Sequence, residues 1–348
     1  METTEINSVS DLSQILQTLG EPEKGHTRFF RGHGDKDWQM LPSIYRETYL
    51  IENEDKIIKD ALTYCPDDFL PSDTLFEKLV KLQHYGYSTR LLDLTTNALV
   101  ALYFAASPYS NKDGELIILD IPYTEIKYGD SDTVAILSAI SLRPSTFKIS
   151  DAIDLANGYK HLAEYEYNGI FKNIPSYPNE YEFKKHMGEK GNLDFHTYSE
   201  LITTPIQRRV AEEGKKAFSA CFNSNEDILS LLHDIQTDKP SFRPVIESSD
   251  LQRVICVRAK LNNARISRQQ GCFLLFGIKG CKTEAAAIPA EWQPSALSSQ
   301  KILVKAESKA DIRQELESFG ISKRTLFPEL EAQAKEIMEQ YNPDSKKP

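Results

Sequence analysis

The side chains best able to bind or transform a ligand crowd into residues 81–106, which read KLQHYGYSTRLLDLTTNALVALYFAA. Groups that donate, accept or carry charge follow one another there, at Gln83, His84, Tyr85, Thr89, Arg90, Asp93 and Thr95. An apolar segment comes next, and Thr96 or Asn97 is suited to cap it as a helix. A polar loop held by a rigid helix is a common way to present a site. The alternative is a solvated loop that merely precedes a helix.

A second group of candidate residues lies at 28–46, RFFRGHGDKDWQMLPSIYR. Its start predicts a short strand, and Gly32 with Gly34 allows a tight exit in which the backbone can approach a ligand. Arg31 stands at the end of that strand, where its planar guanidinium could hold a phosphate or a carboxylate through two hydrogen bonds. A surface arginine in a hairpin is the alternative interpretation.

Together the two stretches resemble the FRG-domain family, named for the Phe-Arg-Gly that stands here at Phe30-Arg31-Gly32. The other parts of the family pattern follow in order, with QHYG at 83–86, TRLLD at 89–93, TTN at 95–97 and ALYFA at 101–105. The segments 255–277 and 325–330 are also typical of this family. The resemblance therefore brackets most of the chain and leaves a less typical middle.

The same series of segments is similar to the ADP-ribosyltransferases of the arginine–serine–glutamate type. Those proteins begin with a strand that carries an aromatic-Arg-Gly and continue with a strand that runs into an Ala-rich helix. An apolar strand that ends near a Pro comes next, and the last strand carries a catalytic Glu. The corresponding segments here are 30–32, 93–105, 114–122 and 268–277. The resemblance implies an α+β fold: an ADP-ribosyltransferase-like split β-sheet core with surrounding helices and a mainly helical insertion.

For the site, the resemblance implies a cleft that binds NAD as the substrate. The cofactor-binding residues that it implies are Arg31, Gly32, Tyr85, Thr89, Arg90 and Thr95. Arg31 would contact the pyrophosphate, and Tyr85 or Tyr87 would form an aromatic wall for the nicotinamide ring. Arg90 has an alternative role, an ion pair with Asp93 that props the loop. We expect these side chains to line one concave site.

Cleavage of the nicotinamide bond needs a group that stabilises the positive charge developing on the ribose. Where the resemblance implies a Glu, this chain has Gln269 within the predicted strand 268–277, and a carboxamide carries no charge. We expect Gln269 rather than Gln270 to face the Arg31 cleft, because Gly271 then leaves space beside it. His84 or Asp93 would contribute to catalysis. The alternative is a domain that binds without reacting.

The chain is expected to divide into the N-terminal half of the core (1–125), a mainly helical insertion (126–250), the C-terminal half with closing helices (251–341), and a disordered tail (342–348). Helices are predicted at 8–20, 43–64, 72–85, 96–106, 132–142, 226–239, 308–319 and 327–341, and strands at 28–31, 115–121, 251–259, 272–278 and 301–306.

The insertion is the expected place of target selection. Its aromatic side chains between 159 and 183, mixed with Lys and Arg, could stack on single-stranded nucleic acid. They could equally pack the insertion onto the main sheet. Arg208 and Arg209 precede Glu212 and Glu213, so these charges can also pair along a helix.

Composition narrows the class of protein. A net charge of −10 gives no overall attraction to nucleic acid, although a local basic groove is compatible with it. The five cysteines lack paired short spacing, so neither a disulfide framework nor a metal site is predicted. The first residues lack the features of a signal peptide, and no apolar run is long enough to span a membrane. A cytoplasmic protein is expected.

The expected function is that of an ADP-ribosyltransferase-like enzyme that uses NAD to modify a macromolecule, RNA, DNA or protein. Such transferases serve as toxins or in phage defence, which would imply an antitoxin or inhibitor protein as a partner. The alternative is a non-catalytic NAD- or nucleotide-binding module, or a protein-interaction module, on a degenerate transferase fold. A hydrolase that releases nicotinamide from NAD is a third interpretation.

Overall fold

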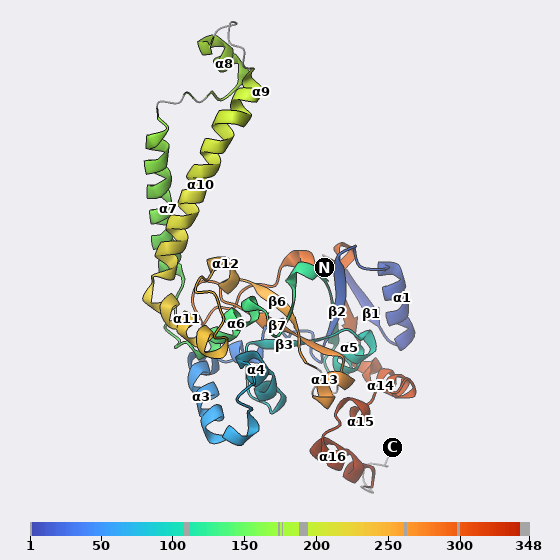
Figure 1. The fold of residues 1–348 in the computed structure, drawn as a ribbon. Coiled ribbons are helices and arrows are strands. Elements are labelled where there is room, and N and C mark those ends of the chain that lie inside the picture. Colours follow the sequence, from blue (N-terminus) through green and yellow to red (C-terminus); the bar gives the residue numbers. More distant parts are fainter. Residues whose placement is uncertain are drawn as a thin grey trace. The chain divides into compact units, whose positions relative to one another are not determined.

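The chain folds into two compact units (Figure 1). The computed structural model describes residues 2–107, 111–172, 175, 177–187, 194–260, 263–297 and 300–341. Residues 1–145 and 251–348 form the first unit, here called the sheet unit, and residues 146–250 form the second, the helical unit. The helical unit thus begins at 146, whereas the insertion was predicted from 126. The predicted tail, 342–348, lies outside the described residues.

A mixed eight-stranded sheet organises the sheet unit and confirms the predicted α+β class. Its strands are β1 (Glu2–Ile6), β2 (His26–His33), β3 (Leu91–Thr95), β4 (Gly114–Pro122), β5 (Ile126–Tyr128), β6 (Val254–Arg258), β7 (Gly271–Phe276) and β8 (Gln300–Val304). Their spatial order is β1-β8-β4-β2-β3-β7-β6-β5. The outermost pairs, β1 with β8 and β5 with β6, are parallel, and the other neighbours are antiparallel. The predicted strands at 28–31 and 115–121 lie within β2 and β4.

The helices of the sheet unit mostly follow the predicted segments. They are α1 (Val9–Leu19), α2 (Thr48–Glu52), α3 (Glu54–Tyr64), α4 (Leu75–His84), α5 (Ala98–Ala105), α6 (Asp132–Ala139), α13 (Ala264–Arg268), α14 (Lys309–Ser318), α15 (Lys323–Leu326) and α16 (Leu330–Gln340). The prediction of one helix over 43–64 was wrong. Asn53, with φ −116° and ψ 15°, leaves helical geometry and separates α2 from α3.

Two apolar cores lie on opposite faces of the sheet. On one face, here called the α5 face, Phe30, Leu116 and Ile118 pack against side chains of α1, α5 and α14. On the other, here called the Trp292 face, Phe29 and Leu119 join side chains of β3, β6 and β7 around Trp292. Since neighbouring residues of a strand point to opposite faces, β2 presents Phe30 to α5 and presents Phe29 and Arg31 to the Trp292 face.

Helix α5 packs directly on the backbone of β2 and β4. A Cβ at Gly32 would lie 2.0 Å from the Ala101 carbonyl oxygen, and one at Gly114 would lie 2.1 Å from the Ala105 carbonyl oxygen. Asn97 begins this helix by accepting hydrogen bonds from the amides of Leu99 and Val100. The small residues of the predicted Ala-rich helix therefore allow close contact between helix and sheet.

The helical unit is built on two long helices that run side by side in opposite directions, α7 (Ser150–Ile170) and α10 (Thr204–Asn223) (Figure 1). Its other helices are α8 (Glu180–Met187), α9 (Phe195–Tyr198) and α11 (Glu226–Asp238), with α12 (Ser248–Leu251) at its end. Phe183 and Tyr198 are buried within this unit, with ring centroids 5.2 Å apart. Among the described residues, no helix has the length and apolarity to span a membrane.

Candidate functional site

The sheet narrows to a single contact between β2 and β3. In the part of the chain that the structure describes, the ladder between these strands consists of one pair, Phe30 with Thr95. By contrast, β2 pairs with β4 along its whole length and β3 pairs with β7 along its whole length. The sheet is therefore two four-stranded halves joined at one point, here called the β2–β3 junction.

Arg31 spans this junction. Its Nη1 donates to the carbonyl oxygen of Asp93 on β3 at 2.5 Å, and its Nε donates to Nε2 of His33 at 2.9 Å. No described residue accepts a hydrogen bond from Nη2, so both N–H groups of that nitrogen are left for another group. Burial lowers the pKa of Arg31 to about 10, with Asp93 opposing this shift and Arg46 adding to it. Arg31 is thus charged at neutral pH.

His33 is a neutral acceptor for Arg31. It is 1% exposed, and burial lowers its pKa to about 3, helped by the positive charges of Arg31, Arg46 and Lys301. An uncharged imidazole can accept from Arg31 at Nε2 without bringing a second positive charge to the junction. The arrangement therefore keeps the positive charge on the guanidinium.

Replacement of His33 should change how the free energy of unfolding depends on pH in the acidic range. The pKa of His33 is about 3 in the folded chain against an ordinary 6.5, so below pH 6.5 the unfolded chain binds a proton that folded His33 does not. The free energy of unfolding therefore decreases as the pH is lowered below 6.5, by up to about 1.4 kcal/mol per pH unit from this group. We expect a smaller loss in His33→Gln when urea unfolding is compared between about pH 7 and about pH 4.5.

The control for this pH series is His161→Gln, which removes a histidine whose side chain is 75% exposed. It should keep the wild-type dependence on pH. An equal loss of stability in His33→Gln and in the wild type would show that His33 takes up its proton as readily in the folded chain as in the unfolded one.

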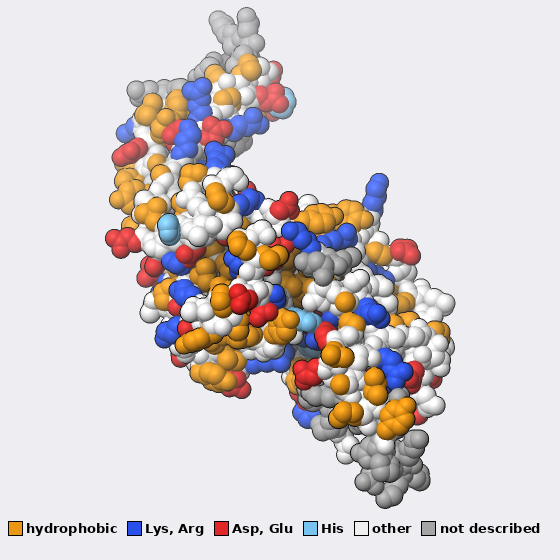
Figure 2. All heavy atoms as spheres, turned by 60° about the horizontal axis from the view of Figure 1, so that its bottom comes forward, with side chains coloured by type: hydrophobic (Ala, Val, Ile, Leu, Met, Phe, Trp, Pro, Cys, Tyr) orange, Lys and Arg blue, Asp and Glu red, His pale blue; other side chains and the backbone are white. Residues whose placement is uncertain are grey.

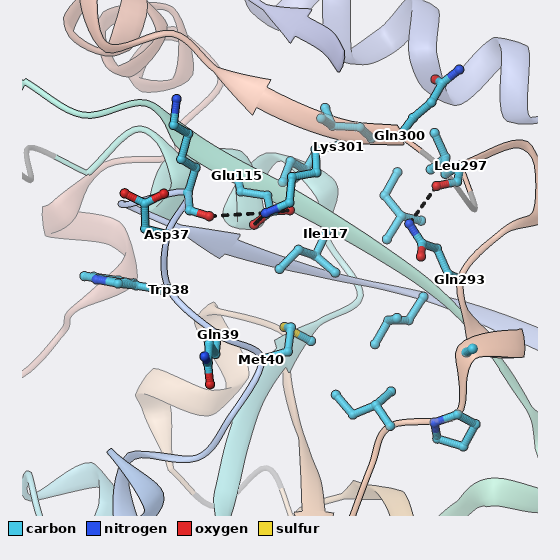
Figure 3. A pocket seen from close by; sticks show the side chains of 18 residues that line it. Asp37, Trp38, Gln39, Met40, Glu115, Ile117, Gln293, Leu297, Gln300 and Lys301 are labelled. Atoms are coloured by element: carbon cyan, nitrogen blue, oxygen red, sulfur yellow. Dashed lines mark hydrogen bonds and ion pairs between the residues drawn. The ribbon is translucent and has the colours of Figure 1, made fainter. Parts of the chain in front are cut away.

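A pocket of 620 Å³, here called the Trp38 pocket, lies along β4, the strand that pairs with β2 (Figure 3). It is lined by the loop 36–40, by residues 115–119 of β4, by residues of 288–297 and by residues 300–302. Ile117 and Glu115 lie opposite Arg31 and His33 in the β2–β4 ladder. Residues directly opposite in an antiparallel pair share a face, so Arg31 flanks this pocket. Its volume is in the range of small-molecule sites.

The pocket combines an aromatic wall with a charged pair. Trp38 contacts His33 edge to face, with centroids 6.0 Å apart, and the Arg46 guanidinium carbon lies 5.9 Å from its ring centroid. Figure 3 shows Glu115 beside Lys301, whose Nζ lies 3.2 Å from the carboxylate. Burial raises the pKa of Glu115, and Lys301 opposes that shift. Sequence reasoning missed Trp38 and Glu115, although a Glu within the apolar strand GELIILDIP was a usable signal.

Arg90 and Thr89 lie in the interior. Arg90 is fully buried, its Nε donates to Glu54 at 2.9 Å, and its Nη1 donates to the Phe276 carbonyl oxygen at 3.1 Å. The hydroxyl of Thr89 donates to Gln83. The alternative ion pair between Arg90 and Asp93 is not formed, because the carboxylate of Glu54 takes its place.

Thr95 lies at the junction, but its hydroxyl is already engaged. It donates to the Gln269 carbonyl oxygen at 2.7 Å and accepts from the amide of Asn97 at 3.0 Å. Thr95 therefore ties the start of α5 to the loop before β7. Of the predicted residues, the structure brings Arg31, Asp93 and Thr95 together at the junction.

The predicted strand placement of Gln269 was wrong. Asn263 accepts from the amides of Arg265 and Ile266 and starts a helical turn, so Gln269 ends α13 instead of lying in β7. Gln270, with φ 48°, then turns the chain into the strand. The Gln269 side-chain amide donates to the Leu326 carbonyl oxygen at 3.1 Å. Gln269 thus links the end of α13 to the C-terminal segment at Leu326.

His84 and Tyr85 line a different pocket, of 1210 Å³, together with residues of α14, α15 and α16. His84 lies 3.4 Å from Glu329, and its pKa is lowered by burial and by Arg265. Tyr85 is exposed. Because this pocket and the Trp38 pocket share no lining residue, the structure does not bring His84 and Tyr85 to Arg31.

The FRG-domain family model matches residues 26–114. The matched segment includes the whole of β2, the β2–β3 junction and α5, and it supports the FRG resemblance over this part of the sheet unit. No curated protein and no solved structure matches the chain.

Each residue of the Phe-Arg-Gly motif meets a different neighbour. Phe30 packs into the core on the α5 face and pairs with Thr95, Arg31 spans the junction, and Gly32 admits the backbone of α5. The motif thus joins the two halves of the sheet, places a guanidinium at their junction and seats a helix behind it.

Proposed function

We propose that this protein is an ADP-ribosyltransferase-like enzyme that uses NAD to modify a macromolecular target, either a nucleic acid or a protein. The observation that carries the proposal is the position of Arg31, at the single-pair junction of two half-sheets and beside the Trp38 pocket. NAD joins an anionic pyrophosphate to two ribose units and two flat rings. A fixed guanidinium next to a pocket with an aromatic wall suits that combination.

The electrostatics around Arg31 favour an anion. Arg31, Arg46 and Lys301 all lower the pKa of His33, so three positive charges lie within electrostatic range of one buried side chain. Nη2 of Arg31 is the donor that we assign to the pyrophosphate. Because His33 is neutral, Arg31 supplies the positive charge that binds the pyrophosphate.

The pocket supplies groups for the other parts of the substrate. We assign Trp38 to a ring of NAD, because an indole offers a flat apolar surface. Glu115 takes the role for which sequence analysis had only Gln269: its carboxylate can accept a hydrogen bond from a ribose hydroxyl and stabilise the cation that forms as nicotinamide departs. Lys301 favours the charged form of Glu115. Asp93, exposed at the junction, is a second carboxylate near Arg31.

Arg31→Lys should weaken NAD binding by about 10- to 100-fold, since a hydrogen bond to a charged group contributes about 1.5–3 kcal/mol. Lysine keeps the charge but loses the planar fork that reaches both Asp93 and a phosphate. Isothermal titration of NAD measures the effect. The matched control is Arg28→Lys on the same strand, where the arginine faces away from the pocket and pairs with Asp120. Equal affinities in wild type and Arg31→Lys would remove Arg31 from the binding site.

Glu115→Gln should slow the release of nicotinamide by at least about 100-fold while changing NAD affinity by less than about threefold, because the carboxylate acts on charge that develops in the transition state. Chromatography of the products with labelled NAD, with and without cell extract, measures both hydrolysis and transfer. Asp120→Asn, on the same strand but paired with Arg28, is the control. Unchanged turnover in Glu115→Gln would move the chemistry to Asp93, the second carboxylate near Arg31.

A non-catalytic NAD-binding module is the second candidate, and Gln269 favours it. This residue has no charge, and its amide is bound to the Leu326 carbonyl oxygen. Saturable NAD binding that depends on Arg31, without turnover by the wild type in any extract, would support the module. The toxin or phage-defence setting, and an antitoxin or inhibitor partner, belong to the transferase proposal.

A further inference from the structure

Helix α7 carries an apolar seam on the side away from α10. Leu155, Gly158, Leu162, Tyr165 and Gly169 follow one another at alternating intervals of three and four residues, the spacing of a coiled-coil seam. The opposite side of α7 faces α10, because a Cβ at Gly214 of α10 would lie 2.6 Å from the carboxylate of Glu164 of α7. In Figure 2, hydrophobic side chains gather along the left edge of the helical unit, where α7 lies in Figure 1.

The large members of this seam have no covering partner in the described chain. Leu155 is 57% exposed, Leu162 is 53% exposed and Tyr165 is 78% exposed. Such side chains in a row on one helix mark a surface for another molecule.

The glycines of the seam point to a close neighbour. A Cβ at Gly158 or at Gly169 would meet nothing within 4 Å, so packing inside this chain does not require either glycine. Glycine is also a poor helix former, and these two lie within a 21-residue helix. Their absence of side chain is explained if a partner places a bulky group against them.

The seam is complementary to itself when two copies run antiparallel about Leu162. A residue seven positions before the centre then faces one seven positions after it, so Leu155 meets Gly169 of the second copy. Leu162 meets its own counterpart, and Gly158, four positions before the centre, lies within one position of Tyr165 of the second copy, three positions after it. A parallel pair would instead oppose glycine with glycine and tyrosine with tyrosine.

The charges beside the seam agree with the antiparallel arrangement. Asp154 would lie near Asn168 of the second copy, and Glu166 near Tyr159 of the second copy. Both partners can donate a hydrogen bond to a carboxylate, so no two like charges are opposed.

We infer that α7 forms an antiparallel interface with α7 of a second copy, so that two hairpins of α7 and α10 pack through their α7 helices about a two-fold axis. Large side chains of each copy fill the spaces left by glycines of the other. This inference is independent of the proposed function, since no residue of the Arg31 site takes part.

Sedimentation of the full chain tests the interface. The wild type should be a dimer, and Leu162→Glu, which places two like charges at the two-fold axis, should raise the dissociation constant by at least about 100-fold. The control is Leu201→Glu, which changes an equally apolar residue of the helical unit, 66% exposed and outside the seam. Circular dichroism checks that each variant is folded. A wild type that stays monomeric at every concentration, or a Leu162→Glu variant that stays dimeric, would overturn the inference.

Cysteine cross-linking tests the direction of the helices. With the more accessible cysteines Cys65, Cys221 and Cys281 replaced by serine, a mixture of Leu155→Cys and Gly169→Cys chains should form mixed disulfide dimers under mild oxidation. Either variant alone should form few. Efficient self-linking of Leu155→Cys with no mixed product would indicate a parallel pair and overturn the antiparallel register.

Discussion

Gly32→Ala should lower the free energy of unfolding by at least about 3 kcal/mol, because overpacking against fixed backbone has no side chain that can yield. The added Cβ would lie 2.0 Å from the Ala101 carbonyl oxygen and 2.5 Å from the Ala105 amide nitrogen. Relief would require α5 to move away from β2, which would also open the contact at Gly114. Urea unfolding followed by circular dichroism measures the loss.

The matched control for this substitution is Gly271→Ala, also in a strand of the same sheet. The nearest atom to its new Cβ is Cγ2 of Ile266 at 3.5 Å, an ordinary contact. Its stability should stay within about 1 kcal/mol of the wild type. If both variants unfold at the wild-type urea concentration, α5 does not lie as close to β2 as described.

The crowding at Gly32 bears on how the Phe-Arg-Gly motif is interpreted. From the sequence, Gly32 was expected to lie in the NAD site, because glycine lets the backbone approach a ligand. In the structure the backbone that approaches Gly32 is that of α5, on the side of β2 opposite to Arg31. The sequence indicates that a glycine is needed at this position, but it does not indicate which segment of the chain packs against it.

Elements with a strong local signal could be predicted from the sequence. The cap at Asn97 and the apolar run that follows it give α5, and the apolar segments at 28–31 and 115–121 give β2 and β4. Strand β1, with the mostly polar sequence ETTEI, was not predicted. It pairs on one side only, with β8 near the other end of the chain. No local sequence pattern indicates so distant a partner strand.

The site was harder to predict because it depends on contacts between distant segments. Arg31, Asp93 and Thr95 come together because β2 and β3 touch at a single pair, which no spacing reveals. Gln269 was placed in a strand because it adjoins an apolar run, but the cap at Asn263 outweighs that signal and starts a helix instead. Glu115 enters the site only through its register opposite His33.

The partners of Arg90 also lie far from it in the sequence and could not be predicted from local spacing. Arg90 lies three positions before Asp93, and both an ion pair between them and a contact of Arg90 with NAD were expected as alternatives. The structure gives it Glu54, at the start of α3, as a buried partner. Lys282 joins the same carboxylate, 3.2 Å from Glu54 Oε2, and it too is fully buried. Arg90, Glu54 and Lys282 thus form one interior charge cluster from three distant segments.

Glu54→Gln should therefore cost about 3–5 kcal/mol of folding free energy, because it leaves two buried cations without their counter-charge. The amide keeps the shape of the side chain and one acceptor oxygen, so packing changes little and the charge is what is lost. Burial already lowers the pKa of Lys282 to about 8, with Glu54 opposing that shift. Without Glu54, Lys282 should release its proton at a lower pH still.

The control for this charge cluster is Glu125→Gln, which makes the same substitution in the ion pair with Arg253, where both side chains are partly exposed. Its cost should be no more than about 1 kcal/mol, since water screens the pair. The two variants also separate the roles considered for Arg90. If Arg90 serves the interior, Glu54→Gln lowers stability and leaves the NAD affinity of the folded fraction unchanged. If it serves NAD, titration of the folded variant shows weaker binding while the urea midpoint stays near that of the wild type.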